Sequence, residues 1–136
     1  MRFICIDLGD SRTGIAVGDD ETKIAHPVRV LDIPIGKLLI DAIVNAIEEH
    51  DADELVMGLP LHMDGTSGSR VEITKEFASK LENEIDININ YQDERLTSDA
   101  AEAVLSRSGK THKQKKQVRD AIAAAEILKD FLDSTP

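Results

Sequence analysis

The first third of the chain consists of short apolar runs separated by glycines. The run from Phe3 to Ile6 is continuously apolar and ends at Asp7, and continuous apolarity predicts a strand covered on both faces. Ile15 to Val17 lie between two glycines, which predicts a hairpin partner for the first strand. A third run, Ala25 to Leu31, mixes valines with polar residues. Because no helical pattern separates these runs, we expect three antiparallel strands.

The pattern then changes to helical spacing. Pro34 is suited to a first helical turn, and apolar residues recur from Leu38 to Ile47 at helical intervals. A strand over Glu54 to Gly58, a loop over Leu59 to Gly68 and a helix from about Ser69 to Asn83 are expected next.

Alternation returns in the last third. Between Ile85 and Tyr91 the odd-numbered positions are apolar or aromatic and the others are Asp or Asn, which predicts a half-exposed strand at a sheet edge. Thr97 or Ser98 is suited to cap a short helix that continues through Leu105. A final helix is expected from about Val118 to Leu132.

The elements therefore follow the order βββαβαβα. Helix-linked strands are parallel and have right-handed crossovers. In the simplest sheet the first strand is central, its two hairpin neighbours lie on one side, and the two later strands lie on the other. We predict an α/β fold with a mixed five-stranded sheet and helices on both faces. The length predicts one domain over residues 1–136.

Charge is distributed unevenly along the chain. There are 16 basic and 26 acidic residues, a net charge of −10. Six of the basic residues and none of the acidic ones lie between Ser106 and Arg119, so the rest of the chain carries −16. The low total charge argues against indiscriminate nucleic-acid binding, whereas the basic segment leaves room for local phosphate contacts. Residues 106–117 have almost no apolar side chain, which predicts a mobile loop.

The sequence lacks the features of a membrane or secreted protein. No window approaches the ~18 apolar residues of a membrane span, and the N-terminus does not resemble a signal peptide. The lone Cys5 cannot form an internal disulfide, so we expect a cytoplasmic protein. No histidine has metal-ligand spacing to another histidine or to Cys5, which disfavours zinc.

Three carboxylates occupy positions that this topology brings together. Asp7 ends the central strand, Glu94 follows the edge strand, and Asp120 opens the last helix. The carboxyl ends of parallel strands and the neighbouring helix termini gather at one edge of a sheet. Three carboxylates there repel one another unless a hard cation such as Mg²⁺ or Mn²⁺ is present. Such a site suits phosphodiester cleavage, in which one metal ion activates water and the other stabilises the leaving oxygen.

Each carboxylate also has an ordinary structural interpretation. Asp7 can form a turn, Asp120 can favour a helix N-terminus, and Glu94 can pair with Arg95 on the surface. The alanines after Asp120 let the last helix approach the sheet closely, although alanine is also the best helix former. The glycine loops at 7–14 and 58–68 either cradle phosphate with backbone amides or simply turn the chain.

Four short motifs stand in order over nearly the whole chain, and together they resemble one family. They are Asp7-Leu8-Gly9 with Arg12, Gly14 and Ala16; Gly58-Leu59-Pro60 with Asp64-Gly65-Thr66 and Gly68; Asp93-Glu94-Arg95-Leu96-Thr97; and Asp120-Ala121-Ile122-Ala123-Ala124 with Ile127-Leu128 and Phe131-Leu132. No single motif is specific, but four at matching spacing make a strong signal. The chain resembles the YqgF family of small bacterial proteins. These are described as Holliday-junction-resolvase-like proteins or as nucleases that process the 5′ end of pre-16S ribosomal RNA.

This resemblance implies a ribonuclease-H-like fold, in agreement with the order of elements. It implies that Asp7, Glu94 and Asp120 are catalytic carboxylates that bind Mg²⁺ or Mn²⁺. In the implied roles, Asp7 bridges the metal ions, Asp120 closes one site, and Glu94 completes the shell or orients water. Asp93 and Asp10 are further candidates for a fourth ligand.

The resemblance also implies how substrate is held. The phosphate-binding candidates are Arg12, Arg95, Lys113, Lys115 and Lys116. The partner is then a nucleic acid, either structured RNA or branched DNA. No membrane contact is expected. A homodimer is compatible with this interpretation, because branched-DNA resolvases act in pairs.

The leading hypothesis is a metal-dependent phosphodiesterase that processes the 5′ end of pre-16S ribosomal RNA. The alternatives are a Holliday-junction-type DNA resolvase and a non-catalytic RNA-binding ribosome-assembly factor. The loop from Asp7 to Gly14 also resembles the first phosphate loop of the actin and sugar-kinase superfamily. Those proteins need a second lobe, for which 136 residues leave no room.

Overall fold

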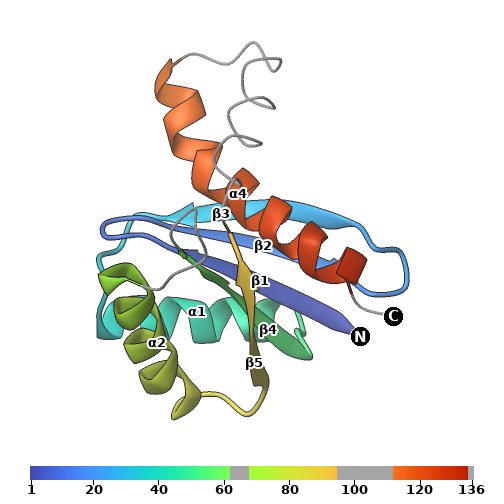
Figure 1. The fold of residues 1–136 in the computed structure, drawn as a ribbon, viewed down its shortest axis with the longest axis horizontal. Coiled ribbons are helices and arrows are strands. Elements are labelled where there is room, and N and C mark those ends of the chain that lie inside the picture. Colours follow the sequence, from blue (N-terminus) through green and yellow to red (C-terminus); the bar gives the residue numbers. More distant parts are fainter. Residues whose placement is uncertain (62–67, 95–111, 135–136) are drawn as a thin grey trace.

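A computed structural model describes residues 1–61, 68–94 and 112–134, with the backbone alone described over 112–117. The described part contains five strands and three helices (Figure 1). In chain order these elements are β1 (Arg2–Leu8), β2 (Thr13–Asp19), β3 (Ala25–Leu31), α1 (Lys37–Glu49), β4 (Glu54–Leu59), α2 (Ser69–Glu82), β5 (Asn88–Asp93) and α4 (His112–Ser134).

The strands form one mixed sheet with β1 at its centre. Their order is β3-β2-β1-β4-β5. The pairs β1–β2 and β2–β3 are antiparallel, whereas β1–β4 and β4–β5 are parallel. This is the arrangement that the order of elements predicts. The prediction that the last strand lies at a sheet edge is confirmed as well.

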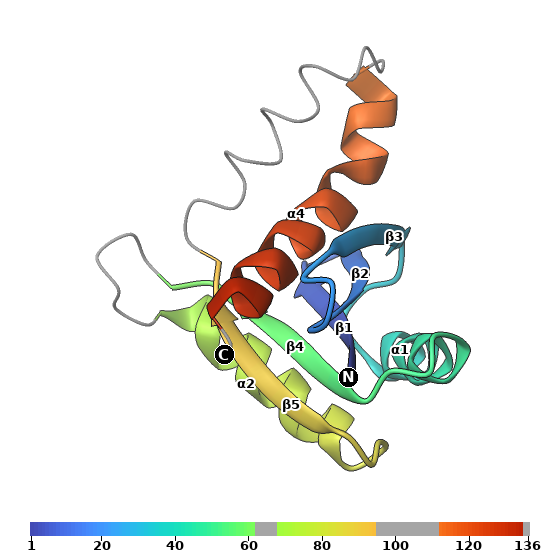
Figure 2. The ribbon, with the colours of Figure 1, turned by 90° about the vertical axis from the view of Figure 1, so that its right-hand side faces the viewer.

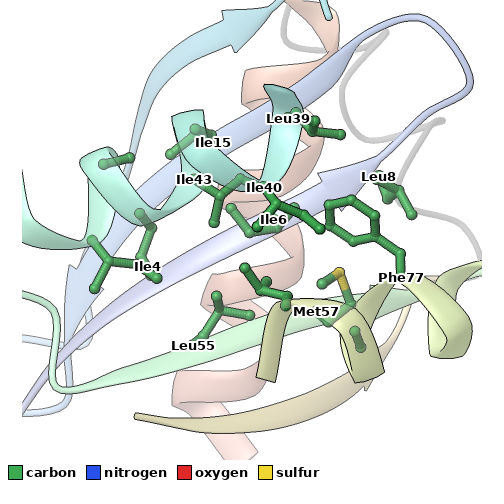
Figure 3. Packing of buried hydrophobic residues seen from close by; sticks show 14 of the residues in the cluster. Ile4, Ile6, Leu8, Ile15, Leu39, Ile40, Ile43, Leu55, Met57 and Phe77 are labelled. Carbon is green, nitrogen blue, oxygen red and sulfur yellow. The ribbon is translucent and has the colours of Figure 1, made fainter. Parts of the chain in front are cut away.

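Helices cover both faces of the sheet. Figure 2 shows α4 on one face and α1 and α2 on the other. The larger apolar cluster lies between the sheet and the pair α1 and α2, and includes Ile6, Ile43, Met57 and Phe77 (Figure 3). The smaller cluster lies under α4, where Leu128 packs against strand residues.

Strand β1 contributes to both clusters because successive side chains of a strand point to opposite faces. Ile4 and Ile6 belong to the cluster under α1 and α2, whereas Phe3 and Cys5 belong to the cluster under α4. All four are buried, which confirms that this strand is covered on both faces. The same alternation directs the side chain of Asp7 to the face that α4 covers.

The final helix begins earlier than the sequence predicts. Residues 112–117, expected to be part of a loop, form the first turns of α4, and the helix continues to Ser134. Asp120 therefore lies two turns inside the helix rather than at its start, so the helix-terminus interpretation of Asp120 is wrong. The segment lacks apolar residues, but Lys and Gln are good helix formers and no Gly or Pro interrupts it.

Two other boundaries also differ. Helix α1 begins at Lys37, so Pro34 precedes the helix instead of occupying its first turn. Strand β5 begins at Asn88, although Ile85 and Ile87 still pack against the larger cluster. The short helix expected after Thr97 or Ser98 lies outside the described residues. Among the helices that are described, none has the length and apolar character needed to cross a bilayer.

Candidate functional site

The three predicted carboxylates line one pocket at the carboxyl end of β1. Its volume is about 310 Å³. Asp7 comes from β1, Glu94 directly follows β5, and Asp120 comes from α4. The lining consists mostly of polar and charged residues: Asp7, Leu8, Gly9, Asp10, Ser11, Arg12, Arg70, Glu94 and Asp120. The topology therefore gathers residues that are more than a hundred positions apart in the sequence.

The carboxyl groups of Asp7 and Glu94 lie close enough to share a hydrogen bond when one of them is protonated. Burial raises the pKa of Asp7 well above its ordinary value, and the charges of Glu94 and Asp120 raise it further. Burial also raises the pKa of Glu94, an effect that the hydrogen bond and the nearby Arg70 oppose. Two carboxylates in contact cannot both ionise easily without a cation. The pair therefore binds a proton more tightly than ordinary carboxyl groups do.

Two glycines, in the strands on either side of β1, make room for the other carboxylates. Gly14 of β2 lies directly opposite Asp7, and a Cβ on Gly14 would collide with the main-chain carbonyl of Asp120. A Cβ on Gly58 of β4 would collide with the carboxylate of Glu94 and lie 2.8 Å from Cδ1 of Ile127. The role of Gly14 in the structure is thus to let α4 lie against the sheet.

The alanines of α4 contribute to the same close approach. Ala121, Ala124 and Ala125 are buried against the sheet face. Small side chains bring a helix backbone close to the strands beneath it, which agrees with the interpretation of the alanine run as a packing surface. The close approach brings Asp120 to the pocket wall.

Asp120 is paired with Arg12. The Nε atom of Arg12 lies 3.6 Å from Oδ2 of Asp120, and the two side chains are 30% and 27% exposed. Burial raises the pKa of Asp120, and the positive charges of Arg12 and Arg119 only partly offset that effect. Asp120 in turn acts on Asp7 through its charge.

The donor set suits a hard divalent cation. The described lining residues offer carboxylate oxygens and no thiolate or imidazole, and Mg²⁺ commonly binds one or two carboxylates together with substrate phosphates. The contacting pair of Asp7 and Glu94 fits that description. No three or more His, Cys, Asp or Glu side chains are grouped for a metal ion in the described parts of the chain. Asp120 is a third carboxylate in the lining of the same pocket.

The two further ligand candidates occupy different positions. Asp10 lines the pocket, where its side chain forms an ion pair with Arg70. Asp93 is the last residue of β5 and is not among the pocket-lining residues. The charge of Asp93 raises the pKa of the neighbouring Glu94.

Arg70 is a pocket residue that the sequence analysis missed. It lies in the first turn of α2, and its Nη1 atom donates a hydrogen bond to Asp10. Its Nη2 atom lies 3.4 Å from the carbonyl oxygen of Leu8, the residue after Asp7. The only signal in the sequence is its position at a helix start after a glycine-containing loop, because its neighbours in space are some 60 residues away.

The basic candidates are placed only in part. Arg12 lines the pocket as expected. Arg95 lies outside the described residues, so the predicted surface ion pair between Glu94 and Arg95 lies outside them too. Lys113, Lys115 and Lys116 belong to the first turns of α4, and their side chains are not described.

Sequence comparisons extend over nearly the whole chain. A family model described as "RuvX: Holliday junction resolvase" matches residues 1–134. A protein of Lactococcus lactis subsp. cremoris (strain SK11), named "Putative pre-16S rRNA nuclease", is 37% identical over 98% of this chain and 94% of its own length. A protein of the same name from Bacillus thuringiensis (strain Al Hakam) is 35% identical over 98% of this chain and 99% of its own length.

Solved structures show the same fold at low sequence identity. The fowlpox virus resolvase, in complex with Holliday junction DNA, aligns over 98% of both chains with a TM-score of 0.62 and 9% identity. Thermus thermophilus RuvC with a Holliday junction substrate aligns over 97% of this chain and 94% of its own, with a TM-score of 0.57 and 12% identity. These likenesses confirm the ribonuclease-H-like fold.

Proposed function

Because this chain belongs to the RuvX family of Holliday junction resolvases, the family also called YqgF, we propose that it is a divalent-metal-dependent endonuclease that processes the 5′ end of pre-16S ribosomal RNA. The observation that carries the proposal is the contact between the carboxyl groups of Asp7 and Glu94 in a pocket that Asp120 also lines. The choice of RNA rests on the name that curated relatives of 35–37% identity carry.

In this mechanism the carboxylates provide the binding site for a divalent cation. Asp7 and Glu94 would hold Mg²⁺ or Mn²⁺ through their carboxylate oxygens, which requires the pair to give up any proton it shares. When bound, such a cation polarises the phosphodiester and lowers the pKa of the attacking water. Asp120 supplies the third carboxylate from α4, and Arg12 keeps it on the pocket wall. Asp7 and Asp120 would hold the cation through their carboxylate oxygens, and Glu94 would complete its ligands or orient the attacking water.

The same proposal covers how the substrate is held. Arg12 supplies a guanidinium inside the pocket. Outside it, Arg95, Lys113, Lys115 and Lys116 contact the phosphate backbone. A net charge of −10 keeps non-specific binding weak, so contacts near the pocket select the substrate. We place the protein in the cytoplasm, where it acts as a monomer or homodimer.

A cleavage panel tests this function. Wild type is compared with Asp7→Asn and with Asp41→Asn, which removes an exposed carboxylate of α1 outside the pocket. The substrates are a precursor ribosomal RNA with its 5′ extension, an unstructured RNA and a four-way DNA junction, each with Mg²⁺, Mn²⁺ or EDTA. We expect metal-dependent cleavage of the precursor RNA by wild type and Asp41→Asn alone.

Each other outcome has a defined meaning. Equal cleavage by Asp7→Asn overturns the assignment of the site. Cleavage of the four-way junction alone supports the DNA resolvase, which the description of the matching family favours. Metal-independent binding of precursor RNA without cleavage supports an assembly factor.

A further inference from the structure

The pocket contains one arginine that the proposed function leaves unused. We propose that Arg70 binds a phosphate group of the nucleic-acid substrate, and that Asp10 holds the guanidinium at the pocket until the substrate displaces it. This inference rests on the proposed function and names a further substrate-binding residue of the same site.

The position of Arg70 fits this role. Its guanidinium contacts the carboxylate of Asp10 and lies 3.4 Å from the carbonyl oxygen of Leu8, the residue next to Asp7. The positive charge acts on both Asp7 and Glu94 and lowers the pKa of each relative to the same pocket without it. Arg70 lines the same pocket as Asp7 and Glu94, so a phosphodiester bound in that pocket lies within its reach.

The negative charge of the pocket means that phosphate binding needs a positively charged side chain that is not already paired with one of its catalytic carboxylates. Four carboxylates line it, namely those of Asp7, Asp10, Glu94 and Asp120, and these repel a polyanion. Among the lining residues that the structure describes, only Arg12 and Arg70 are positive, and Arg12 is paired with Asp120. A guanidinium matches the geometry of a phosphate with two parallel hydrogen bonds, which makes Arg70 a suitable phosphate contact.

Exchange of Asp10 for phosphate needs no rearrangement of the fold. The side chains of Arg70 and Asp10 are 43% and 79% exposed, and ion pairs this exposed contribute little to stability. The backbone beneath Arg70 is held independently. The carbonyl of Arg70 accepts a hydrogen bond from Oγ1 of the buried Thr74 at 2.9 Å, and the next residue, Val71, is buried in the core. The guanidinium can therefore turn from Asp10 to a phosphate while α2 stays in place.

A purely structural interpretation makes a different prediction. If Arg70 only fastens the loop after β1 to α2, then removal of either partner breaks the same contact. Arg70→Gln and Asp10→Asn should then change substrate binding in the same direction. If Arg70 binds phosphate, the two substitutions act in opposite directions, because Asp10 competes with the substrate for the guanidinium.

The test measures binding of precursor RNA to the non-cleaving Asp7→Asn protein by fluorescence anisotropy in Mg²⁺. Into this parent we introduce Arg70→Gln, Arg70→Lys, Asp10→Asn and the pair of Arg70→Gln with Asp10→Asn. The matched control is Arg29→Gln, which removes an arginine with similar exposure from an ion pair with Glu49 at 2.8 Å, away from the pocket. Thermal unfolding of each variant verifies that it is folded.

We expect Arg70→Gln to weaken RNA binding about tenfold. The slope of log K against the logarithm of the salt concentration should become shallower by about one, the amount expected for the loss of one phosphate contact. Arg70→Lys should recover part of the loss, and Arg29→Gln should stay within about twofold. Asp10→Asn should tighten binding, and most of that gain should vanish when Arg70 is also changed, as in a double-mutant cycle.

Two results overturn the inference. One is an Arg70→Gln protein that binds like Arg29→Gln. The other is equal weakening by Arg70→Gln and Asp10→Asn, which identifies the contact as a structural fastening. Failure of the proposed function is separate, because then wild type does not cleave the RNA, whether or not the Asp7→Asn parent binds it. If wild type cleaves the RNA and Arg70→Gln leaves RNA binding unchanged, the proposed function stands and only the role of Arg70 is overturned.

Discussion

The main chain of Asp120 in α4 lies directly against Gly14 of β2, with no space for even a methyl group between them. Gly14 is also the residue paired with Asp7 on the neighbouring strand. One glycine thereby sets both the distance of α4 from the sheet and the place of Asp120 relative to Asp7. Stability and the candidate site are therefore linked at this position.

Gly14→Ala should reduce both stability and activity. The added methyl group meets main-chain atoms, which cannot rotate away, so α4 has to shift. We expect a loss of about 1–3 kcal/mol or more in the free energy of unfolding, measured by urea denaturation, together with loss of cleavage. The matched comparison is Gly58→Ala, where the colliding atoms belong to the side chains of Glu94 and Ile127. It should keep more stability than Gly14→Ala yet still lose activity. The opposite ranking of stabilities would contradict this account.

The metal-free protein should lose stability as pH rises. The ordinary pKa is 3.8 for Asp7 and 4.5 for Glu94, and folding raises both. Below these ordinary values both states are protonated, whereas above them the unfolded state binds fewer protons than the folded state. The free energy of unfolding therefore falls with pH until the raised pKa values are passed. Melting temperatures between pH 4 and 8, without metal, measure this slope.

Asp7→Asn is the matched variant for that experiment. It removes the main source of repulsion in the pocket, so its melting temperature should depend less on pH and exceed that of wild type at pH 8. Added Mg²⁺ should stabilise wild type at pH 8 and have little effect on Asp7→Asn. A wild type as insensitive to pH as the variant would contradict the assignment of the raised pKa values to this pair.

The Mg²⁺ requirement of cleavage should increase as pH falls. The cation and the proton compete for Asp7 and Glu94, because the ligands must be deprotonated to bind metal. In the pH range where Mg²⁺ binding displaces one proton from the pair, the Mg²⁺ concentration for half-maximal activity should rise by up to tenfold for each unit by which the pH is lowered. Titrations of Mg²⁺ at pH 6, 7 and 8 measure this, and the maximal rate at saturating Mg²⁺ serves as the control. A half-maximal concentration that is independent of pH would rule out this competition.

Arg12→Gln should affect activity more than stability. Its ion pair with Asp120 is partly exposed and about 3.6 Å long, so its loss should cost about 1 kcal/mol or less of unfolding free energy. Without the guanidinium the pKa of Asp120 rises further, and the pocket loses one of the two positive side chains among its described lining residues. We expect kcat/KM for RNA cleavage to fall about tenfold or more. If kcat/KM falls only in proportion to the loss of folded protein, Arg12 has a structural role.

The order of the strands could be predicted from the sequence because the relevant signals are local. The continuous apolar run of β1 and the alternation around Ile89 report how many faces of each strand are buried. Helical spacing between later strands requires parallel crossovers. The places of Asp7, Glu94 and Asp120 at one end of the sheet follow from this topology.

Helix boundaries and close contacts depended on the tertiary structure. The basic residues at 112–117 carry no apolar stripe, so periodicity could not reveal that they continue α4. A glycine in a strand is equally consistent with a turn, a phosphate loop or a close approach. Only the crossing of Asp120 over Gly14 identifies the close approach.

The sequence by itself determined the topology and the three carboxylates, because burial patterns and motif spacing are properties of adjacent residues. Only the tertiary structure decided that Asp7 and Glu94 touch, that Asp120 stands apart with Arg12, and that Arg70 enters the pocket. Those relationships join segments separated by 60 to more than 100 residues. The physical reason is that contact, desolvation and charge coupling depend on distance in space, which packing of the helices on the sheet sets.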